Sequence, residues 1–511
     1  ACVNPLALVQ CVPDARPSGP ALTRRAFLAL TLPLVASACS SANQAAAPAS
    51  QAAVAAAGAL PSPAGQASAA QSPNALEKPV PSQAVRATGA PAGRDIASGS
   101  GSPLPVAGRG TSASPPTGAA TASGGSPVTP ASGPAAASPP FRASSRGPSA
   151  AAGPRLAYVA NSSTKVEQLI GDFDKQVKKP TTNLTQTRFG IVGTDLGNSF
   201  EHNGKLYFLF GDTPQPFAPD PLGYSDSVDP NGPLAIQFLS TKPGTFLPVK
   251  PPGISMGPFE TPAAGLSLNG SMYISVITNY TSDFMSERSV LTRYDESTGA
   301  YSVVRTVSQL PGGHFVKMTL RAAPTGLSGL PTSDPYVLMF GAGAYRKSNV
   351  YLAAIPAQSF TSGDNTRYFA GMNGAAPRWS TNEGDAAPLV NDQRIGDVSA
   401  SFIGQLGLWI MTYDSRDARF KGVNLCYARQ PWGPWSEPLV IYNEERDRGF
   451  GAFVHDPRTK PDDGLGGPVI GSADAVSTAG GTYAPYIIER FTRIQGGALM
   501  LQYVLSTWNP Y

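Results

Sequence analysis

Short apolar runs separated by turn residues dominate the chain from residue 154 to its end. In the stretch 193–213, an apolar run, the step Asn203–Gly204 and a second apolar run follow one another. This is the pattern of a β-hairpin, because Asn and Gly tolerate the positive φ angles that a two-residue turn requires. The pattern returns around Asn269–Gly270. The region 154–511 is therefore predicted to be all-β.

The hairpins belong to units of about 50 to 70 residues, each with several short strands. Such a repeat favours a β-propeller over a β-sandwich or jelly roll, which would use fewer strands and remains the alternative. In a propeller the first strand of each unit lines a central channel. We predict a five-bladed β-propeller built from residues 190–254, 259–306, 314–355, 395–442 and 483–506.

The composition changes sharply before this region. Residues 40–153 are mainly Ala, Pro, Ser and Gly, without aromatic or β-branched runs. Such a segment cannot bury enough apolar surface to offset the entropy of an ordered chain. We predict a disordered linker at 40–153, which would act as a solvated spacer for a folded domain at 154–511.

Residues 1–39 carry export motifs. The sequence TRRAFL at 23–28 matches the twin-arginine motif, and an apolar run at 26–38 follows that is too short to span a bilayer as a helix. Cys39 then lies where a lipoprotein would be processed and acylated; an ordinary signal peptide is the alternative. We expect export to the periplasm or cell surface, with a membrane anchor if Cys39 is acylated.

The cysteines fit this interpretation. Residues before Thr23, with Cys2 and Cys11 among them, are predicted to be an upstream extension that is removed with the signal. Cys39 and Cys426 would remain, without a disulfide if Cys39 is acylated. Cys426 lies in an apolar run and is expected to be a small buried hydrophobe.

Charge and metal-binding residues limit the partners. The net charge is +4, and no Lys/Arg cluster alternates with aromatic residues, which argues against nucleic acid. The three histidines, His202, His314 and His455, are widely separated and have no neighbour at ligand spacing. We therefore predict no metal site and no cofactor, and we expect a monomer.

Acidic residues on the first strands of several units point to a shared site at the hub. Glycoside hydrolysis requires two carboxyl groups that face each other across the scissile bond, one protonated and one ionised. Lys317 is an alternative to His314 on the third strand. The candidate catalytic residues are Asp195, Asp397, Glu260 and Asp212, and the candidate contacts to a polysaccharide substrate are His314, Tyr483, Tyr486, Trp508 and Thr261.

Each candidate also has a structural interpretation. Asp195 before Leu-Gly and Asp212 at the end of an apolar strand are both residue types that stabilise turns. Glu260 before Thr-Pro would accept hydrogen bonds at the start of a strand. His314 would be a structural histidine, and Tyr483, like Tyr486, would be part of the core.

At these residues the chain resembles the domain-of-unknown-function family 4185 (DUF4185). The matching pieces span Phe189 to Tyr511: GTDLGNSFEHNGKLYFLFGDT, FETPAAGLSLNGSMYISV, IGDVSASF, WGPWSEP, TYAPYI and LSTWNPY. Members with an assigned activity form a glycoside hydrolase family of endo-D-arabinanases on a five-bladed propeller.

The resemblance implies cleavage within D-arabinofuranose polymers of the kind found in mycobacterial arabinogalactan and lipoarabinomannan. Asp195 matches a candidate catalytic carboxylate of the family. Asp397 lies where Glu is expected in many relatives, which moves the carboxyl group back by one methylene. This difference is the best support for the alternative, a non-catalytic carbohydrate-binding surface lipoprotein on the same fold.

Overall fold

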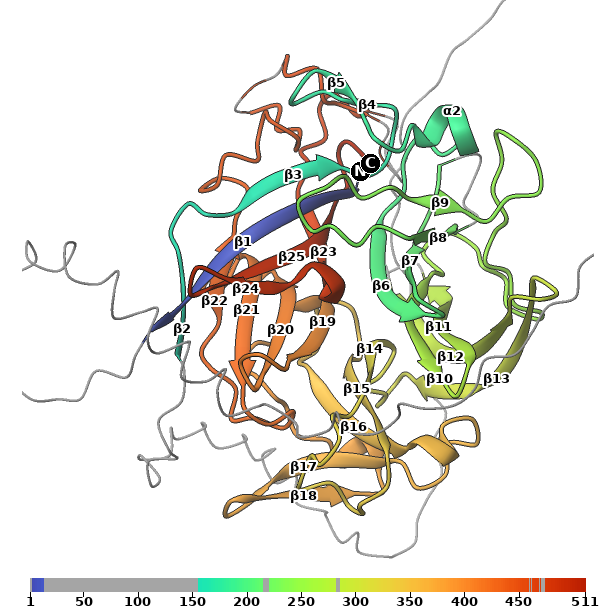
Figure 1. The fold of residues 1–511 in the computed structure, drawn as a ribbon, viewed down its shortest axis with the longest axis vertical. Helices are drawn as coiled ribbons and strands as arrows, with labels where there is room; N and C mark the ends of the chain where they lie inside the picture. Colours follow the sequence, from blue (N-terminus) through green and yellow to red (C-terminus); the bar gives the residue numbers. More distant parts are fainter. Residues whose placement is uncertain are drawn as a thin grey trace, which may run out of the picture. The chain divides into compact units, whose positions relative to one another are not determined.

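Five antiparallel sheets are arranged around a common centre as the blades of a β-propeller (Figure 1). The computed structural model describes residues 2–12, 155–214, 220–281, 285–458, 460, 462–467, 469 and 474–511. The predicted all-β fold with five blades is confirmed. Cys39, the export motifs and the linker lie outside the described residues.

The first blade is built on the predicted hairpin. Its turn residues Asn203 and Gly204 have φ angles of 48° and 78°. The side chains of the second strand alternate between two neighbouring cores, which explains why nearly every position of this strand is apolar. The strands, in sheet order, are β6 (Leu196–His202), β7 (Lys205–Phe210), β8 (Leu222–Ser225) and β9 (Gln237–Phe238).

The next three blades follow the chain in the same way, each with its first strand next to the hub. The second blade contains β10 (Pro262–Leu268), β11 (Ser271–Thr281), β12 (Met285–Asp295) and β13 (Ala300–Gln309). The third contains β14 (Lys317–Ala322), β15 (Tyr336–Ala342), β16 (Tyr351–Pro356), β17 (Arg367–Asn373) and β18 (Ala376–Ser380). The fourth contains β19 (Ile395–Ile403), β20 (Leu408–Ser415), β21 (Gly422–Ala428) and β22 (Leu439–Tyr442).

The fifth blade joins the two ends of the propeller. Strands from the end of the chain pair with strands from its beginning, so that the last sheet closes the ring (Figure 1). Its strands are β23 (Thr482–Ile487), β24 (Arg493–Gln495), β25 (Ala498–Thr507), β1 (Cys2–Val12), β2 (Arg155–Tyr158) and β3 (Thr164–Gln168).

Strand β1 differs from the sequence prediction, which placed residues 1–39 outside the folded domain. It pairs with β25 from Cys2 opposite Ser506 to Gln10 opposite Ala498. The side chains of Cys2, Val3, Ala7 and Val9 are buried in the cores on either side of the sheet, as expected for a central strand. Their short apolar run resembled an extension because the export motif follows it in the sequence and its pairing partner lies at the far end of the chain.

Helical structure in the described part of the chain is limited to short segments: α2 (Thr185–Phe189), η1 (Ala357–Ser359), η2 (Glu383–Asp385) and η3 (Glu489–Phe491), beside a two-stranded ribbon of β4 (Phe173–Asp174) and β5 (Lys179–Pro180). Among the described residues, none of these helices has the length and apolar character needed to cross a bilayer.

The apolar core lies between neighbouring blades. Between the first and second blades, Phe200 and Leu209 pack with Met272, Ile274 and Val290. A similar cluster between the fourth and fifth blades includes Ala7 and Val9 of β1. Burial of these side chains fixes each sheet against the next, and the ends of the inner strands are thereby held at the hub.

The contact between Phe200 and Gly265 gives a test of this packing. The Phe200 ring occupies the space where a Cβ at position 265 would lie. We therefore expect Gly265→Ala to lower the free energy of unfolding by about 1–3 kcal/mol through overpacking, measured by urea unfolding. Gly404→Ala is the control, because no atom lies within 4 Å of its Cβ position; a loss as large in this control would contradict the packing argument.

Candidate active site

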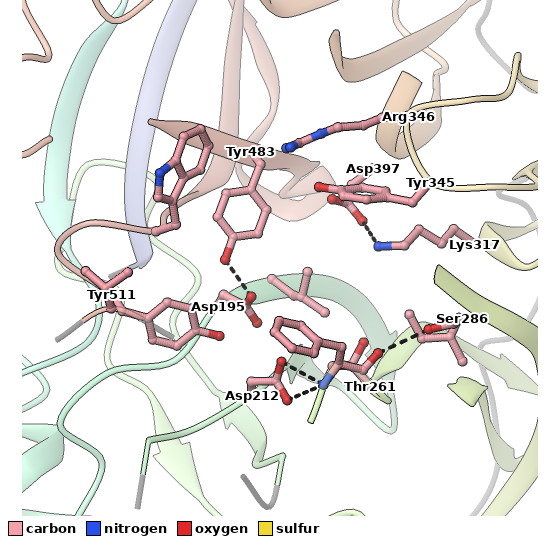
Figure 2. Close-up of a pocket in the computed structure, with 15 residues that line it drawn as sticks. Asp195, Asp212, Thr261, Ser286, Lys317, Tyr345, Arg346, Asp397, Tyr483 and Tyr511 are labelled. Carbon is pink, nitrogen blue, oxygen red and sulfur yellow. Dashed lines mark hydrogen bonds and ion pairs between the residues drawn. The ribbon is translucent and has the colours of Figure 1, made fainter. Parts of the chain in front are cut away.

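A cavity of about 280 Å³ lies at the hub, and every blade contributes to its wall (Figure 2). The five inner strands carry, in chain order, Asp195 and Leu196, Thr261, Lys317, Asp397, and Tyr483 at or next to their ends. The other lining residues are Asp212, Phe259, Ile277, Ser286, Tyr345, Arg346, Val469, Trp508 and Tyr511.

Irregular backbone positions these side chains. The strand register shifts in β6 between Leu196 and Asn198, in β19 between Ile395 and Val398, and in β23 between Tyr483 and Tyr486. A β-bulge bends its strand and redirects the neighbouring side chain. Asp195, Asp397 and Tyr483 therefore lie at points where the strand leaves its regular pairing.

Several non-glycine residues at the cavity have left-handed backbone. The φ angles of Leu196, Phe259 and Arg346 are 62°, 66° and 56°, and that of Ala484, next to Tyr483, is 55°. Such conformations cost about 1–3 kcal/mol each and are retained where the surrounding structure enforces them, often at functional sites. The concentration of strain supports a functional role for this cavity.

Asp195 is a buried carboxyl group held by a tyrosine. The Tyr483 hydroxyl donates to its Oδ2 at 2.5 Å, and its Oδ1 lies where a Cβ on Gly211 would be. Burial raises the pKa of Asp195 to about 6, with a smaller contribution from the Asp397 charge, while the hydroxyls of Tyr483 and Tyr511 oppose the rise. Asp195 can therefore hold a proton in mildly acidic solution.

Asp212 is the second carboxyl group on the same blade. Its two oxygens accept the Phe259 N–H at 2.9 and 3.0 Å. Burial and the neighbouring Asp195 charge raise the pKa of Asp212 to about 7. Neighbouring like charges disfavour the simultaneous ionisation of both groups. Asp195 and Asp212 can therefore hold one proton between them.

Asp220 belongs to the same acidic group without lining the cavity. The residue is fully buried, and neither carboxylate oxygen has a hydrogen-bond partner among the described residues. Burial, followed by the charges of Asp212, Asp195 and Glu260, raises the pKa of Asp220 well above its usual range. Burial and these charges therefore disfavour the ionised form of Asp220.

Asp397 has a contrasting environment. Its Oδ1 lies 3.1 Å from the Lys317 ammonium (Figure 2). The same oxygen accepts a hydrogen bond from the Tyr486 hydroxyl, also at 3.1 Å. A cationic neighbour and donated hydrogen bonds stabilise the ionised form of a carboxylate. The cavity therefore contains carboxyls in two electrostatic settings.

Asp414 supports Asp397 from the next strand. Its Oδ1 accepts the backbone N–H of Asp397 at 2.8 Å and that of Ala484 at 3.4 Å, and its Oδ2 lies 3.4 Å from Arg346 Nη2. A Cβ on Gly396 would overlap this carboxylate. Asp414 thereby ties the third, fourth and fifth blades together at the cavity.

Six of the candidate residues line the cavity: Asp195, Asp212, Asp397, Thr261, Tyr483 and Trp508. Tyr486 contacts Asp397 through its hydroxyl without lining the cavity. Lys317, the alternative to His314 on the third blade, is the residue that reaches the cavity.

Glu260 and His314 differ from the prediction. The Glu260 carboxylate accepts hydrogen bonds from Ser255, Gly257, Thr278 and Asn279, which outweigh burial and lower its pKa. Glu260 therefore has the structural role of accepting hydrogen bonds at the start of a strand.

The His314 ring stacks on Tyr351 with the centroids 4.1 Å apart, and its backbone N–H donates to Glu383. Desolvation lowers its pKa. The ring is therefore engaged away from the cavity.

The sequence interpretation missed Asp414, Asp220, Tyr345, Arg346 and Tyr511. A signal existed for Asp414, since it ends an apolar second strand of its blade much as Asp212 follows β7. Tyr345 and Arg346 lie in the loop between β15 and β16, where no periodicity marks them. Within the described ranges, no group of three or more His, Cys, Asp or Glu side chains is placed to hold a metal ion.

Residues 181–511 match the family described as domain of unknown function DUF4185. The chain belongs to the DUF4185 family. This confirms the resemblance drawn from the motifs, and the family match covers all five inner strands. A search of curated proteins found no match.

Solved structures give weaker similarities. An exo-β-1,3-galactanase from Phanerochaete chrysosporium with β-1,3-galactotriose is 10% identical, with a TM-score of 0.34 over 66% of this chain and 64% of that chain. The GH43_1 enzyme from Xanthomonas citri with xylotriose is 12% identical, with a TM-score of 0.32 over 61% and 86%. The chain thus spans less than two thirds of the galactanase. Similarity at this level carries no argument about the chemistry of this chain. The argument about chemistry rests on the residues of the cavity.

The buried state of Asp220 predicts a pH dependence. Because its pKa is raised, the folded state keeps a proton that the unfolded chain releases above about pH 4. The stability contributed by this proton is present at low pH and is lost as the pH rises. Relative to the wild type, Asp220→Asn should therefore gain up to about 1.4 kcal/mol in the free energy of unfolding per pH unit above about pH 4, until the pH reaches the raised pKa of the folded state.

Urea unfolding at pH 4, 6 and 8 measures this difference. Asp226→Asn, at an exposed position, controls for the loss of one carboxyl group. A difference between Asp220→Asn and the wild type that stays constant with pH would show that Asp220 is ionised in the folded state.

Proposed function

We propose that the protein is a glycoside hydrolase that cleaves within D-arabinofuranose polymers of the arabinogalactan or lipoarabinomannan type. The observation that carries this proposal is the contrast between carboxyls in one cavity. Burial raises the pKa of Asp195 and Asp212, whereas Asp397 is paired with Lys317. Glycosidases require such a pair, one carboxyl to donate a proton and one to act as an anion.

Asp195 and Asp397 are the proposed pair. Asp195, in its protonated form, donates a proton to the leaving glycosidic oxygen, and the Asp397 carboxylate acts on the opposite side of the sugar ring as base or nucleophile. Lys317 and Tyr486 keep Asp397 oriented. Asp212, whose pKa burial and the Asp195 charge raise to about 7, keeps its proton while Asp195 ionises, so the two carboxyls titrate as a pair.

The walls of the cavity suit a sugar. Trp508 and Tyr345 present aromatic rings, on whose faces the C–H groups of a furanose can pack, while Thr261 and Ser286 offer hydroxyls. The choice of D-arabinan rests on the family resemblance. The proposed place of action is the cell envelope, supported by the motif at 23–28. The proposal requires that residues 2–12 stay attached to the domain, because β1 is a central strand of the fifth blade and processing at Cys39 would remove it.

Removing either proposed catalytic carboxyl should abolish cleavage. Asp195→Asn and Asp397→Asn are expected to lower the release of arabino-oligosaccharides from purified mycobacterial arabinogalactan by about 10²-fold or more. Product formation is measured by a reducing-end assay with chromatographic sizing.

Asp417→Asn, which removes a carboxyl outside the cavity, is the control and should keep full activity. Thermal unfolding verifies that each variant is folded. Retention of arabinan by the wild type without any cleavage would favour the non-catalytic binding lipoprotein, the second candidate, for which the shorter Asp397 is the supporting feature.

The hydrogen bond from Tyr483 predicts a change in the pH profile. This bond lowers the pKa of Asp195. With Asp195 as the general acid, kcat/KM should fall as the pH rises through about 6, the pKa of this group. Tyr483→Phe should move this alkaline limb to higher pH, because the ionised form of Asp195 loses a donor. A limb that stays in place or moves to lower pH would argue against Asp195 as the acid.

A further inference from the structure

Cations and aromatic rings alternate along a row that starts in the cavity wall and ends at Arg416, which packs on the wall residue Trp508. Lys317 Nζ lies 4.0 Å from the ring centre of Tyr345, and the Arg346 guanidinium lies 4.6 Å from the same ring. Arg346 also lies 5.9 Å from the Trp508 ring, and Arg416 lies 4.7 Å from it. We call these five residues the cation–aromatic row. Figure 2 shows its members Lys317, Tyr345 and Arg346 on one side of the cavity.

The positive charges of the row are compensated unequally. Lys317 has a close carboxylate, Asp397, whereas Arg346 reaches Asp414 only at 3.4 Å. The Nε of Arg346 is buried and has no hydrogen-bond partner among the described residues. The compensation therefore weakens from Lys317 toward the arginine end.

Arg416 is the least compensated member. It donates to the Thr482 carbonyl at 3.5 Å and makes no ion pair within 4.0 Å to any described residue. The carboxylates that act on it from further away are Asp414 and Glu444, and Glu444 is itself engaged by two donors of Thr482. Arg416 is therefore the member of the row with no carboxylate at ion-pair distance among the described residues.

Other arginines of this chain show what a structural pairing looks like. Arg419 lies 2.8 Å from Asp417, and Arg458 lies 2.9 Å from Asp456. In contrast, burial and then the charge of Arg346 lower the pKa of Arg416, so the two guanidiniums beside Trp508 repel each other. The left-handed backbone of Arg346 adds strain at the same place.

We propose that Arg346 and Arg416 form an anion subsite, which takes a negatively charged substituent on the glycan, a carboxylate or a phosphate ester. An anion between the guanidiniums would relieve their repulsion and accept the unused donors of Arg346. Trp508, which both arginines contact, would carry the sugar that bears the substituent. The inference deepens the proposed function and rests on it for the identity of the glycan.

The subsite is tested first without a glycan. The full chain is titrated with succinate and with inorganic phosphate by isothermal calorimetry. Arg416→Gln should weaken binding of the anion by at least about tenfold, which corresponds to the loss of one charge-assisted hydrogen bond. Arg416→Lys should retain part of the affinity, and Arg419→Gln, a matched arginine outside the cavity, should bind as the wild type does.

Thermal unfolding verifies that Arg416→Gln is folded. Anion affinity that is equal in the wild type and Arg416→Gln, or no binding of either anion to the wild type, would overturn the subsite.

The second test uses the polymer. Affinity electrophoresis compares an unmodified arabinan with samples of the same polymer that have been chemically succinylated or phosphorylated. The wild type should bind an acidic polymer at least about tenfold more tightly than the neutral one, and Arg416→Gln should lose this preference.

The outcomes separate the two proposals. If the protein binds free anions but does not prefer an acidic polymer, the arginines bind a free anion. That result would overturn the proposal that the subsite takes a substituent on the glycan. Cleavage of neutral and acidic polymers at equal rates would leave the hydrolase standing without the subsite. Binding of the acidic polymer without cleavage would leave the subsite standing and remove the hydrolase.

Discussion

The burial of carboxyl groups at the hub is the constraint on which the rest of the site depends. A carboxylate removed from water must either take up a proton or find a cation and hydrogen bonds. Asp195, Asp212 and Asp220 on the first blade tend toward the first course, because burial and the charges of neighbouring carboxylates raise each pKa. Asp397 follows the second, through Lys317 and Tyr486. The chemical division of the cavity follows from this difference.

Closure of the ring keeps these groups together. Each carboxyl comes from the end of a strand whose position is fixed by cores between blades, and the fifth sheet locks the last blade to the first part of the chain. The bulges then provide the local adjustment, since they turn Asp195, Asp397 and Tyr483 out of the regular pleat. Rigid sheets with irregular ends allow carboxyls from different blades to share one cavity.

The blades and several cavity residues could be predicted from the sequence because they depend on local patterns. Features that depend on distant pairing or on loop contacts could not. Hairpins such as that at Asn203–Gly204 are local, so the turn residues and the apolar runs identify the blades. Asp195, Asp397 and Tyr483 followed from the rule that inner strands face the channel. Glu260 lies at an equivalent position, but donors of the loop before it and of the next strand capture its carboxylate. Strand β1 could not be assigned because its pairing partner β25 lies at the far end of the chain.

Two glycines at the hub are required because buried carboxylates occupy the space where their side chains would lie. Gly211 leaves room for the Asp195 carboxylate and Gly396 for that of Asp414, so a side chain at either position would displace a carboxyl at the hub. The two pairs lie on the first and fourth blades, and each glycine directly precedes a cavity aspartate, Asp212 or Asp397. The Gly-Asp step therefore does two things at once: it gives the site one carboxyl and makes space for another. Because neither glycine has a positive φ angle, the need for glycine at both positions arises from this close approach and not from the backbone.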